Sequence, residues 1–418
     1  MREMKDSGVP WIGNMPADWE LVSIKRLFTI GRGRVIAQTE LDETGYPVYS
    51  SQTKDNGCLG YIDTYDYDYP QLTWTTDGAN AGSIFLRDGY YNCTNVCGTL
   101  NPIGDLVDLR YQKYALEHIA YNERRIDTNG YKIMNNEMAI IKTLLPPLSV
   151  QHQIADYLDI KCTQIDNIIV TEQAVIEKLQ EYKRAIITQA ITRGLNSSTK
   201  MKKTELEWIG MIPEHWNVKK IKYLTSKIGS GKTPKGGSDV YTDEGILFIR
   251  SQNVYDGYFD LSSAVFISPE IDCTMSNTRV YRDDVLLNIT GGSIGRSCLY
   301  EFDELANVNQ HVCIIRCNSQ MRPKFMQYFW NSSIGKTSID IYQSGANREG
   351  LNFFEIGNTV VPTPELDEQE QIIDYLDNKC DAIDRVISQK LTIIDTLAEY
   401  KRSLIYEVVT GKKAVPHV

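Results

Sequence analysis

The chain has 418 residues and a formal net charge of −10, and 42% of its residues are hydrophobic. At roughly 150 residues per domain this length predicts a multidomain protein, and the ordinary composition leaves little room for long disordered tracts. The negative charge disfavours nucleic-acid binding through positive charge over the whole surface, so any such binding must be local. Nine cysteines without regular close spacing indicate reduced thiols. Apolar runs far shorter than the roughly 20 residues of a membrane span predict a soluble, cytoplasmic protein.

The sequence contains an internal repeat. The segment Trp-Ile-Gly-Asn-Met-Pro-Ala-Asp-Trp at 11–19 returns as Trp-Ile-Gly-Met-Ile-Pro-Glu-His-Trp at 208–216. The segments 154–162 and 181–184 return 218 positions later, at 372–380 and 399–402. The ends of the repeat therefore match while its middle differs, as expected if two copies share a scaffold and meet different ligands.

Residues 1–148 predict the first α+β globule. Short β-branched and aromatic runs alternate with Gly, Asn, Asp and Pro turns, and a helix is expected over 109–121. A basic segment without acids, 21–39, follows the first tryptophan motif, and a glycine-bracketed polar turn lies at 75–82. These segments suggest contact with DNA phosphates and bases. The candidate DNA-binding residues here are Arg32, Arg34, Lys54, Thr76 and Asn80.

Residues 149–193 predict a long helix, because this stretch lacks Gly and Pro and its apolar residues recur at helical spacing. One heptad column contains the core residues Leu158, Ile165, Leu179 and Ile186. The neighbouring column, also assigned to the core, contains Lys161, Ile168, Val175 and Tyr182. About 45 residues at 1.5 Å each give a helix of roughly 67 Å, which should pair with a second helix as a coiled coil.

Residues 194–363 predict the second α+β globule, with strands at 246–249, 285–287 and 312–315 and a helix over 323–330. Its basic segment, 219–235, carries six lysines and no acid. One such run alone is usually a solvated face, but the repetition of the run at a corresponding place favours phosphate contact. The candidate DNA-binding residues here are Lys232, Lys235, Arg279, Ser293, Arg296 and Arg348.

Residues 364–418 predict the second long helix, over 365–410, and a C-terminal tail. The core column of this helix contains Leu376, Ile383, Leu397 and Leu404, which match the first helix column for column. Glu172 and Lys390 interrupt these columns at equivalent positions. Antiparallel packing about a pseudo-dyad predicts an ion pair between them, and the alternative is that both side chains point to solvent.

The sequence offers no convincing catalytic or metal site. Residues 229–233, Gly-Ser-Gly-Lys-Thr, imitate the end of a phosphate-binding loop, but Ser226 stands where its first glycine belongs and Pro234 follows. The Cys-x-x-x-Cys pairs at 93–97 and 313–317 lack a second pair or a nearby histidine. We therefore expect no catalytic residue, no bound metal and no cofactor in this chain.

The whole chain resembles the specificity subunit of type I restriction-modification systems. The resemblance rests on the order globule, helix, globule, helix, on Leu-Pro-Pro-Leu-Ser-Val-Gln-His-Gln-Ile at 145–154, on Glu-Tyr-Lys-Arg near each helix end, and on Val-Thr-Gly-Lys at 409–412. It implies an α+β fold, with two target recognition domains separated by two long helices that form an antiparallel coiled coil. Each domain would read one half of a bipartite, asymmetric DNA target.

The same resemblance implies that the coiled coil sets the spacer between the half-sites and docks two modification subunits. Those subunits would bring S-adenosylmethionine, and two restriction subunits with ATP and Mg would join in some assemblies. The chain itself would be non-catalytic. The competing hypotheses are a nuclease or methyltransferase in its own right, and a coiled-coil scaffold whose globules bind protein partners.

Overall fold

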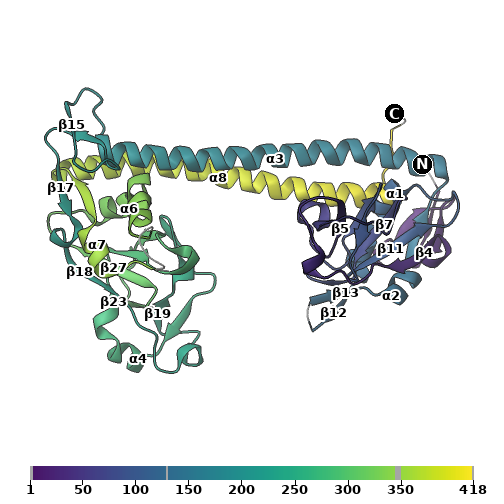
Figure 1. The fold of residues 1–418 in the computed structure, drawn as a ribbon, viewed down its shortest axis with the longest axis horizontal. Coiled ribbons are helices and arrows are strands. Elements are labelled where there is room, and N and C mark those ends of the chain that lie inside the picture. The colour runs from purple at the N-terminus through teal and green to yellow at the C-terminus, as the bar shows by residue number, and fades with distance from the viewer. Residues whose placement is uncertain (1–2, 129, 344–349, 417–418) are drawn as a thin grey trace. The chain divides into compact units, whose positions relative to one another are not determined.

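The computed structural model describes residues 3–128, 130–343 and 350–416, and the chain divides into two compact units (Figure 1). The first unit comprises residues 1–172 and 391–418, and the second comprises residues 173–390. Each unit contains one α+β globule and one part of each of two long helices. No helix within the described residues is both long and apolar enough to cross a membrane.

The first unit is built on a four-stranded antiparallel sheet in the order β4 (Phe28–Arg32), β11 (Cys97–Pro102), β7 (Gln71–Thr75) and β9 (Ile84–Arg87). Helix α1 (Leu109–Glu123) covers this sheet, because Leu116 and Ile119 share a buried cluster with Leu72 and Trp74. The smaller elements are β1 (Met4–Asp6) with β2 (Asn14–Pro16), β3 (Glu20–Ser23) with β14 (Lys142–Leu145), β5 (Tyr46–Tyr49) between β6 (Cys58–Ile62) and β10 (Asn92–Cys93), β13 (Gly130–Lys132) between β12 (Arg125–Asp127) and β8 (Asp77–Gly78), and α2 (Asn135–Ile140).

The second unit repeats this sheet in the order β18 (Thr225–Ser230), β27 (Val312–Cys317), β24 (Asp284–Asn288) and β25 (Ser297–Leu299). Helices α5 (Pro323–Asn331) and α6 (Ser333–Gln343) occupy the place of α1 in the chain order. The smaller elements are β15 (Met201–Lys203) with β16 (Met211–Pro213), β17 (Asn217–Lys220) with β28 (Val360–Thr363), β19 (Ile246–Ile249) between β22 (Val265–Ile267) and β26 (Ala306–Val308), β23 (Arg279–Val280) beside β26, the hairpin β20 (Val254–Tyr255) and β21 (Tyr258–Phe259), α4 (Pro269–Thr274) and α7 (Phe353–Asn358).

The predicted elements of both globules are confirmed with small shifts. The strands expected at 246–249, 285–287 and 312–315 lie in β19, β24 and β27. The helices expected over 109–121 and 323–330 continue to Glu123 and Asn331. The α+β class and the duplication of the globule therefore follow from the sequence pattern.

The repeated tryptophan motif forms the joint between each globule and the long helices. In the first unit, Trp19 is buried in a cluster with Leu158 and Leu404. In the second unit, Trp216 is buried with Leu376, and its indole nitrogen donates to the Glu368 carboxylate at 2.9 Å. The motif recurs in the sequence because the same joint is built twice.

The long helices are α3 (Leu148–Arg193) and α8 (Leu366–Val409), and they lie side by side within each unit (Figure 1). In the first unit the early part of α3 packs on the late part of α8, and in the second unit the reverse holds, so the pairing is antiparallel. Of the predicted core residues, Leu158, Ile165, Ile186, Leu376, Ile383 and Leu404 are buried, and Leu179 and Leu397 are partly buried against the same clusters.

The second predicted core column is wrong by one position. Ile168 is 47% exposed and Tyr182 is 58% exposed, whereas Cys162 and Ile176 are 4% and 8% exposed. Counted from any residue of the first column, the residue three positions later and the residue four positions later lie on opposite sides of that column, since one helical turn takes 3.6 residues. Both sides are largely apolar in this sequence, and a single partner helix buries only one of them.

Two repeat-related ion pairs join the helices. Lys401 Nζ lies 2.7 Å from an Asp166 carboxylate oxygen in the first unit, and Lys183 Nζ lies 2.6 Å from Asp384 in the second. Asp384 and Lys401 each follow their counterparts by 218 positions, so the two pairs are copies of one contact. The pair predicted between Glu172 and Lys390 would join one unit to the other, and it stays a prediction.

Candidate nucleic-acid interface

Most of the predicted contact residues of each globule gather at one end of its central sheet. In the first unit β4 ends at Arg32, opposite Gly98, and β7 ends at Thr75, opposite Cys97. The segments that leave these strands therefore meet there, and Thr94 N donates to Tyr49 O at 2.9 Å, which brings the end of β5 to the same place. We call this region the loop end; it comprises residues 33–36, 50–57, 76–83 and 94–96 in the first unit, and 231–236, 250–253, 289–296 and 309–311 in the second.

The two glycine-bracketed polar turns singled out in the sequence are the same turn in space. Gly82 N donates to Thr75 O at 2.9 Å, and Gly295 N donates to Asn288 O at 2.8 Å. Two further main-chain bonds repeat in each copy, from Ala81 to Gly78, from Ser83 to Asn80, from Ile294 to Gly291 and from Arg296 to Ser293. Asn80 and Ser293 therefore occupy equivalent positions, which the dissimilar sequences of the two turns do not reveal.

A glycine precedes the equivalent cations Arg34 and Lys232 for a steric reason. A Cβ on Gly33 would lie 2.2 Å from Cys93 O, and a Cβ on Gly231 would lie 1.7 Å from Val308 O. Only glycine permits this close approach of two backbones. In the Gly-Ser-Gly-Lys-Thr segment, Gly231 therefore serves chain packing. Strand β18 ends at Ser230, and the next helical element in the chain is the 3-10 turn η5 (Gly237–Val240).

In the first unit, four of the five predicted contacts are exposed at the loop end or directly beside it. Arg32 donates to Asn95 O, and Arg34 forms an ion pair with Asp66 at 3.0 Å. Asn80 donates to Ser51 O at 3.2 Å, and Lys54 lies in the 3-10 turn η3 (Lys54–Gly57). These side chains can reach a ligand that covers this end of the sheet.

Thr76, the fifth predicted contact, is placed differently. Its side chain is 0% exposed, and its hydroxyl donates to Val96 O at 3.1 Å. The hydroxyl therefore holds the loop end together from within the globule, and this position offers DNA no surface.

The turn at 54–57 is held by Arg87, which the sequence did not single out. Arg87 is 2% exposed, and its guanidinium donates to Asn56 O at 2.7 Å and to the Thr73 hydroxyl at 3.2 Å. The guanidinium also stacks 3.6 Å from the Tyr49 ring centroid, and burial lowers its pKa. Because Asp55 and Asn56 have left-handed φ values of 49° and 52°, Arg87 supports a strained turn from below.

In the second unit, the candidates fall into two groups. Lys232 donates to Thr274 O at 2.8 Å, Lys235 is exposed in the following turn, and Ser293 is half-buried in the 3-10 turn η8 (Gly291–Ser293). Arg296 lies 4.5 Å above the Tyr255 ring. These four residues belong to the loop end of the second globule.

The remaining two candidates differ from these. Arg279 bonds the nearly buried Asp272 carboxylate through Nε at 2.9 Å and Nη2 at 2.5 Å, and this partner raises the pKa of Arg279. Asp272 also accepts from Asn307 at 2.9 Å, so Arg279 belongs to an internal network. Arg348 lies outside the described residues.

Sequence reasoning also missed Asn288, which is 0% exposed. Its amide nitrogen donates to Ser251 O at 2.7 Å, as Asn80 donates to Ser51 O in the first unit. The available signal was the dipeptide Ser-Gln at 51–52, which returns at 251–252 after the glycines at 45 and 245. In both units an asparagine thus joins the loop end of the central sheet to the segment that follows the neighbouring strand.

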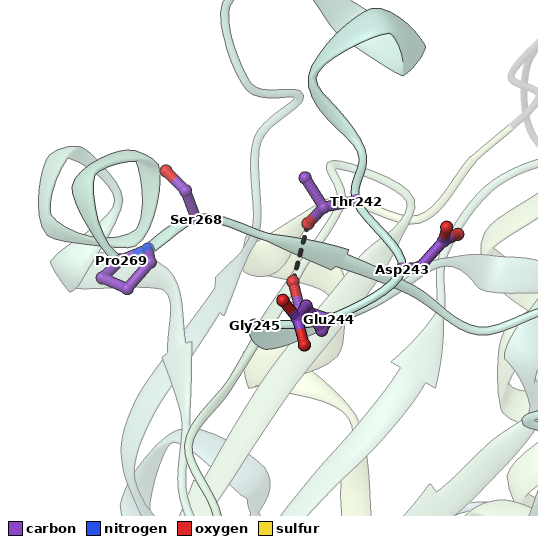
Figure 2. Close-up of a pocket in the computed structure, with 6 residues that line it drawn as sticks. All are labelled: Thr242, Asp243, Glu244, Gly245, Ser268 and Pro269. Atoms are coloured by element: carbon purple, nitrogen blue, oxygen red, sulfur yellow. Dashed lines mark hydrogen bonds between the residues drawn. The ribbon is translucent and has the colours of Figure 1, made fainter.

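Other kinds of site find little support. Among the described residues, no group of three or more His, Cys, Asp or Glu side chains could hold a metal ion, and all nine cysteines are free thiols. Figure 2 shows an open depression of the second unit, lined by Thr242, Asp243, Glu244, Gly245, Ser268 and Pro269. Thr242 donates to the Glu244 carbonyl at 2.8 Å there. Its two carboxylates make it a poor site for phosphate, and none of the predicted contacts lines it.

Comparison with known proteins gives a consistent result. The family model described as the type I restriction modification DNA specificity domain matches residues 16–181 and again residues 213–393. The MjaVIII specificity subunit of Methanocaldococcus jannaschii is 27% identical over 424 residues, which cover 97% of this chain and 95% of that protein. The EcoBI specificity subunit of Escherichia coli is 27% identical over 348 residues, covering 76% of this chain and 71% of that protein.

A solved chain from work on complex assembly and conformational transition of the type I R-M system shares the fold. It has a TM-score of 0.67 at 13% identity and covers 96% of this chain and 99% of its own. The two matches to the family model coincide with the two structural repeats, and no comparison supports a scaffold that binds only protein. The chain therefore belongs to the type I restriction modification DNA specificity family, as a specificity subunit with two target recognition domains.

Proposed function

We propose that each globule reads one half of a bipartite, asymmetric DNA target with its loop end. The observation that carries this proposal is the equivalence of the two turns: the main-chain bonds repeat, while Asn80 in one copy is replaced by Ser293 in the other. Amide and hydroxyl side chains on a fixed turn read different base edges from the same position. Exposed Arg32, Lys54 and Lys232 supply phosphate contacts that orient the globule.

We further propose that the paired helices set the spacer between the half-sites. The separation of two half-sites on DNA is a geometric consequence of the separation of the two readers. The repeat-related ion pairs support a fixed helix register, because a lysine among apolar core positions discriminates against other registers.

We also propose that two modification subunits dock on this chain. Two exposed pairs of apolar side chains, one pair in each unit, support that number. Ile168 and Tyr400 are 47% and 51% exposed in the first unit, and Val386 and Tyr182 are 39% and 58% exposed in the second. The pairs are related by the repeat, so one kind of partner fits both places. S-adenosylmethionine, and ATP and Mg where two restriction subunits join, belong to the partners. This chain is then a non-catalytic recognition subunit.

The proposal is tested by expressing the chain with candidate modification subunits and mapping adenine methylation across the host DNA. We expect one bipartite motif with a fixed spacer, and exchange of residues 15–140 for those of another specificity subunit should change only one half of it. An assembly that binds these partners but methylates no bipartite motif would contradict the proposal. If the assembly showed no salt-dependent affinity for duplex DNA, a protein-binding scaffold would be favoured instead.

A further inference from the structure

Each globule is fastened to its long helix by a buried glutamine, and the two glutamines are repeat equivalents. Gln151 of α3 and Gln369 of α8 lie 218 positions apart, and both are 0% exposed. Each lies one heptad before the first core residue of its helix, Leu158 or Leu376, and neither belongs to a loop end. Their hydrogen bonds show what they do.

The Gln151 side chain makes three bonds to the first globule. Its carbonyl oxygen accepts from Asp108 N at 2.9 Å, and its amide nitrogen donates to Leu106 O at 3.0 Å and to Pro146 O at 2.9 Å. Asp108 caps the start of α1, the helix that covers the sheet. Gln151 therefore links the cap of α1, the end of the sheet region and the first turn of α3.

Gln369 repeats this arrangement in the second unit. Its carbonyl oxygen accepts from Arg322 N at 2.8 Å, and its amide nitrogen donates to Pro364 O at 2.9 Å and to Gln320 O at 3.3 Å. Arg322 precedes α5 as Asp108 precedes α1. In each unit the glutamine thus bonds one main-chain N–H and two main-chain carbonyls, although only the proline is the same residue type in both units.

Further contacts reinforce each attachment along the helix. Tyr114 of α1 donates to Asp159 of α3 at 2.8 Å, and Tyr328 of α5 donates to Asp377 of α8 at 2.5 Å. A glutamine provides an acceptor and two donors together, which neither glutamate nor leucine does. Burial makes this requirement strict, because a lost partner leaves main-chain groups without hydrogen bonds.

We infer that Gln151 and Gln369 are positioning residues for spacer discrimination: they fix the angle between each recognition globule and its helix, and so limit the complex to one half-site separation. This inference rests on the proposed function. A globule that pivots on its helix could engage its half-site at a neighbouring separation, whereas the sequence that it reads would not change, because the loop end is untouched.

The test uses the full methyltransferase complex with Gln151→Leu, Gln369→Leu, and Gln164→Leu as the matched control. Gln164 lies on α3 and is exposed, so its substitution makes the same chemical change without touching a globule. Methylation rates are measured on duplexes with the native spacer and with one base pair more or less. We expect the ratio of altered-spacer to native-spacer rate to rise about tenfold for Gln151→Leu and Gln369→Leu, the factor that corresponds to about 1.4 kcal/mol. The ratio should stay unchanged for Gln164→Leu.

A merely structural role gives a different result. It lowers the methylation rate on every duplex by the same factor and leaves the spacer ratio unchanged, which would overturn the inference. If the leucine variants do not fold, Gln151→Asn keeps the amide but shortens its reach, and it should still raise the ratio. A native complex that methylates no bipartite motif would refute the proposed function itself, so the two failures are distinguishable.

Discussion

Reversal of one interhelical ion pair is expected to destabilise the first unit, and reversal of both partners to restore it. Lys401 Nζ lies 2.7 Å from Asp166, and the two side chains are 29% and 52% exposed. Because water screens a pair this exposed, its loss alone should cost no more than about 1 kcal/mol. Lys401→Glu replaces the attraction with repulsion, which is about 4 kcal/mol at 4 Å and an effective dielectric constant of 20 before the side chains move apart.

Rotation of the side chains and salt reduce this repulsion, so we expect Lys401→Glu to lower the free energy of unfolding by about 2 kcal/mol at low salt. In a unit of this size that corresponds to a decrease in Tm of about 4–8 °C. Lys183→Glu should give a similar decrease in the second unit, since its pair has nearly the same geometry.

The assay is thermal unfolding of the full chain by calorimetry, at low salt and again in 1 M salt, where the effect should shrink. The double variant Asp166→Lys with Lys401→Glu should recover most of the lost Tm, because it restores opposite charges. A double variant as unstable as Lys401→Glu alone would refute the assignment of this contact as an electrostatic pair. It would also weaken the argument that the pair fixes the helix register.

Three more predictions concern the globules. Arg87→Met should lower the stability of the first unit by about 2 kcal/mol, because it removes two charge-assisted bonds beneath the strained turn, and an unchanged Tm would contradict this. Burial raises the pKa of Asp108, but hydrogen bonds from His152 and from backbone amides prevail and hold it low. The stability that ionised Asp108 contributes is therefore fully present above its unfolded pKa of about 3.9 and is lost as the pH falls through its lower folded pKa. Between pH 7 and pH 3, the free energy of unfolding should consequently decrease more steeply for the native chain than for Asp108→Asn. Lys232→Ala should reduce the slope of log affinity against log salt by about 0.9, the value for one phosphate contact, in binding measured at several salt concentrations with the full complex.

The sequence was a good guide to the scaffold and a partial guide to the candidate site. Helix α3 begins at Leu148, one residue from its predicted start, because Pro147 and Gly194 mark its limits. The register of the second core column failed, since exposed Ile168 and buried Cys162 are both apolar and only the partner helix distinguishes them. Likewise, Thr76 belongs to the same polar turn as the exposed Asn80, and only the structure shows that Thr76 is buried.

The structure also explains why the two copies match at their ends and differ in their middles. At the joints, the bonds are made by side chains: Gln151 to Asp108 and Gln369 to Arg322, and Tyr114 to Asp159 as Tyr328 to Asp377. A side-chain bond requires a particular residue, so these positions recur in the sequence. At the loop ends the repeated bonds are made by the main chain, which any residue without special φ requirements can supply. Side chains on the turns are therefore free to change while the turn persists. A specificity subunit needs this division, because a new DNA target can be read by altering the turns while both joints and the spacing stay as they are.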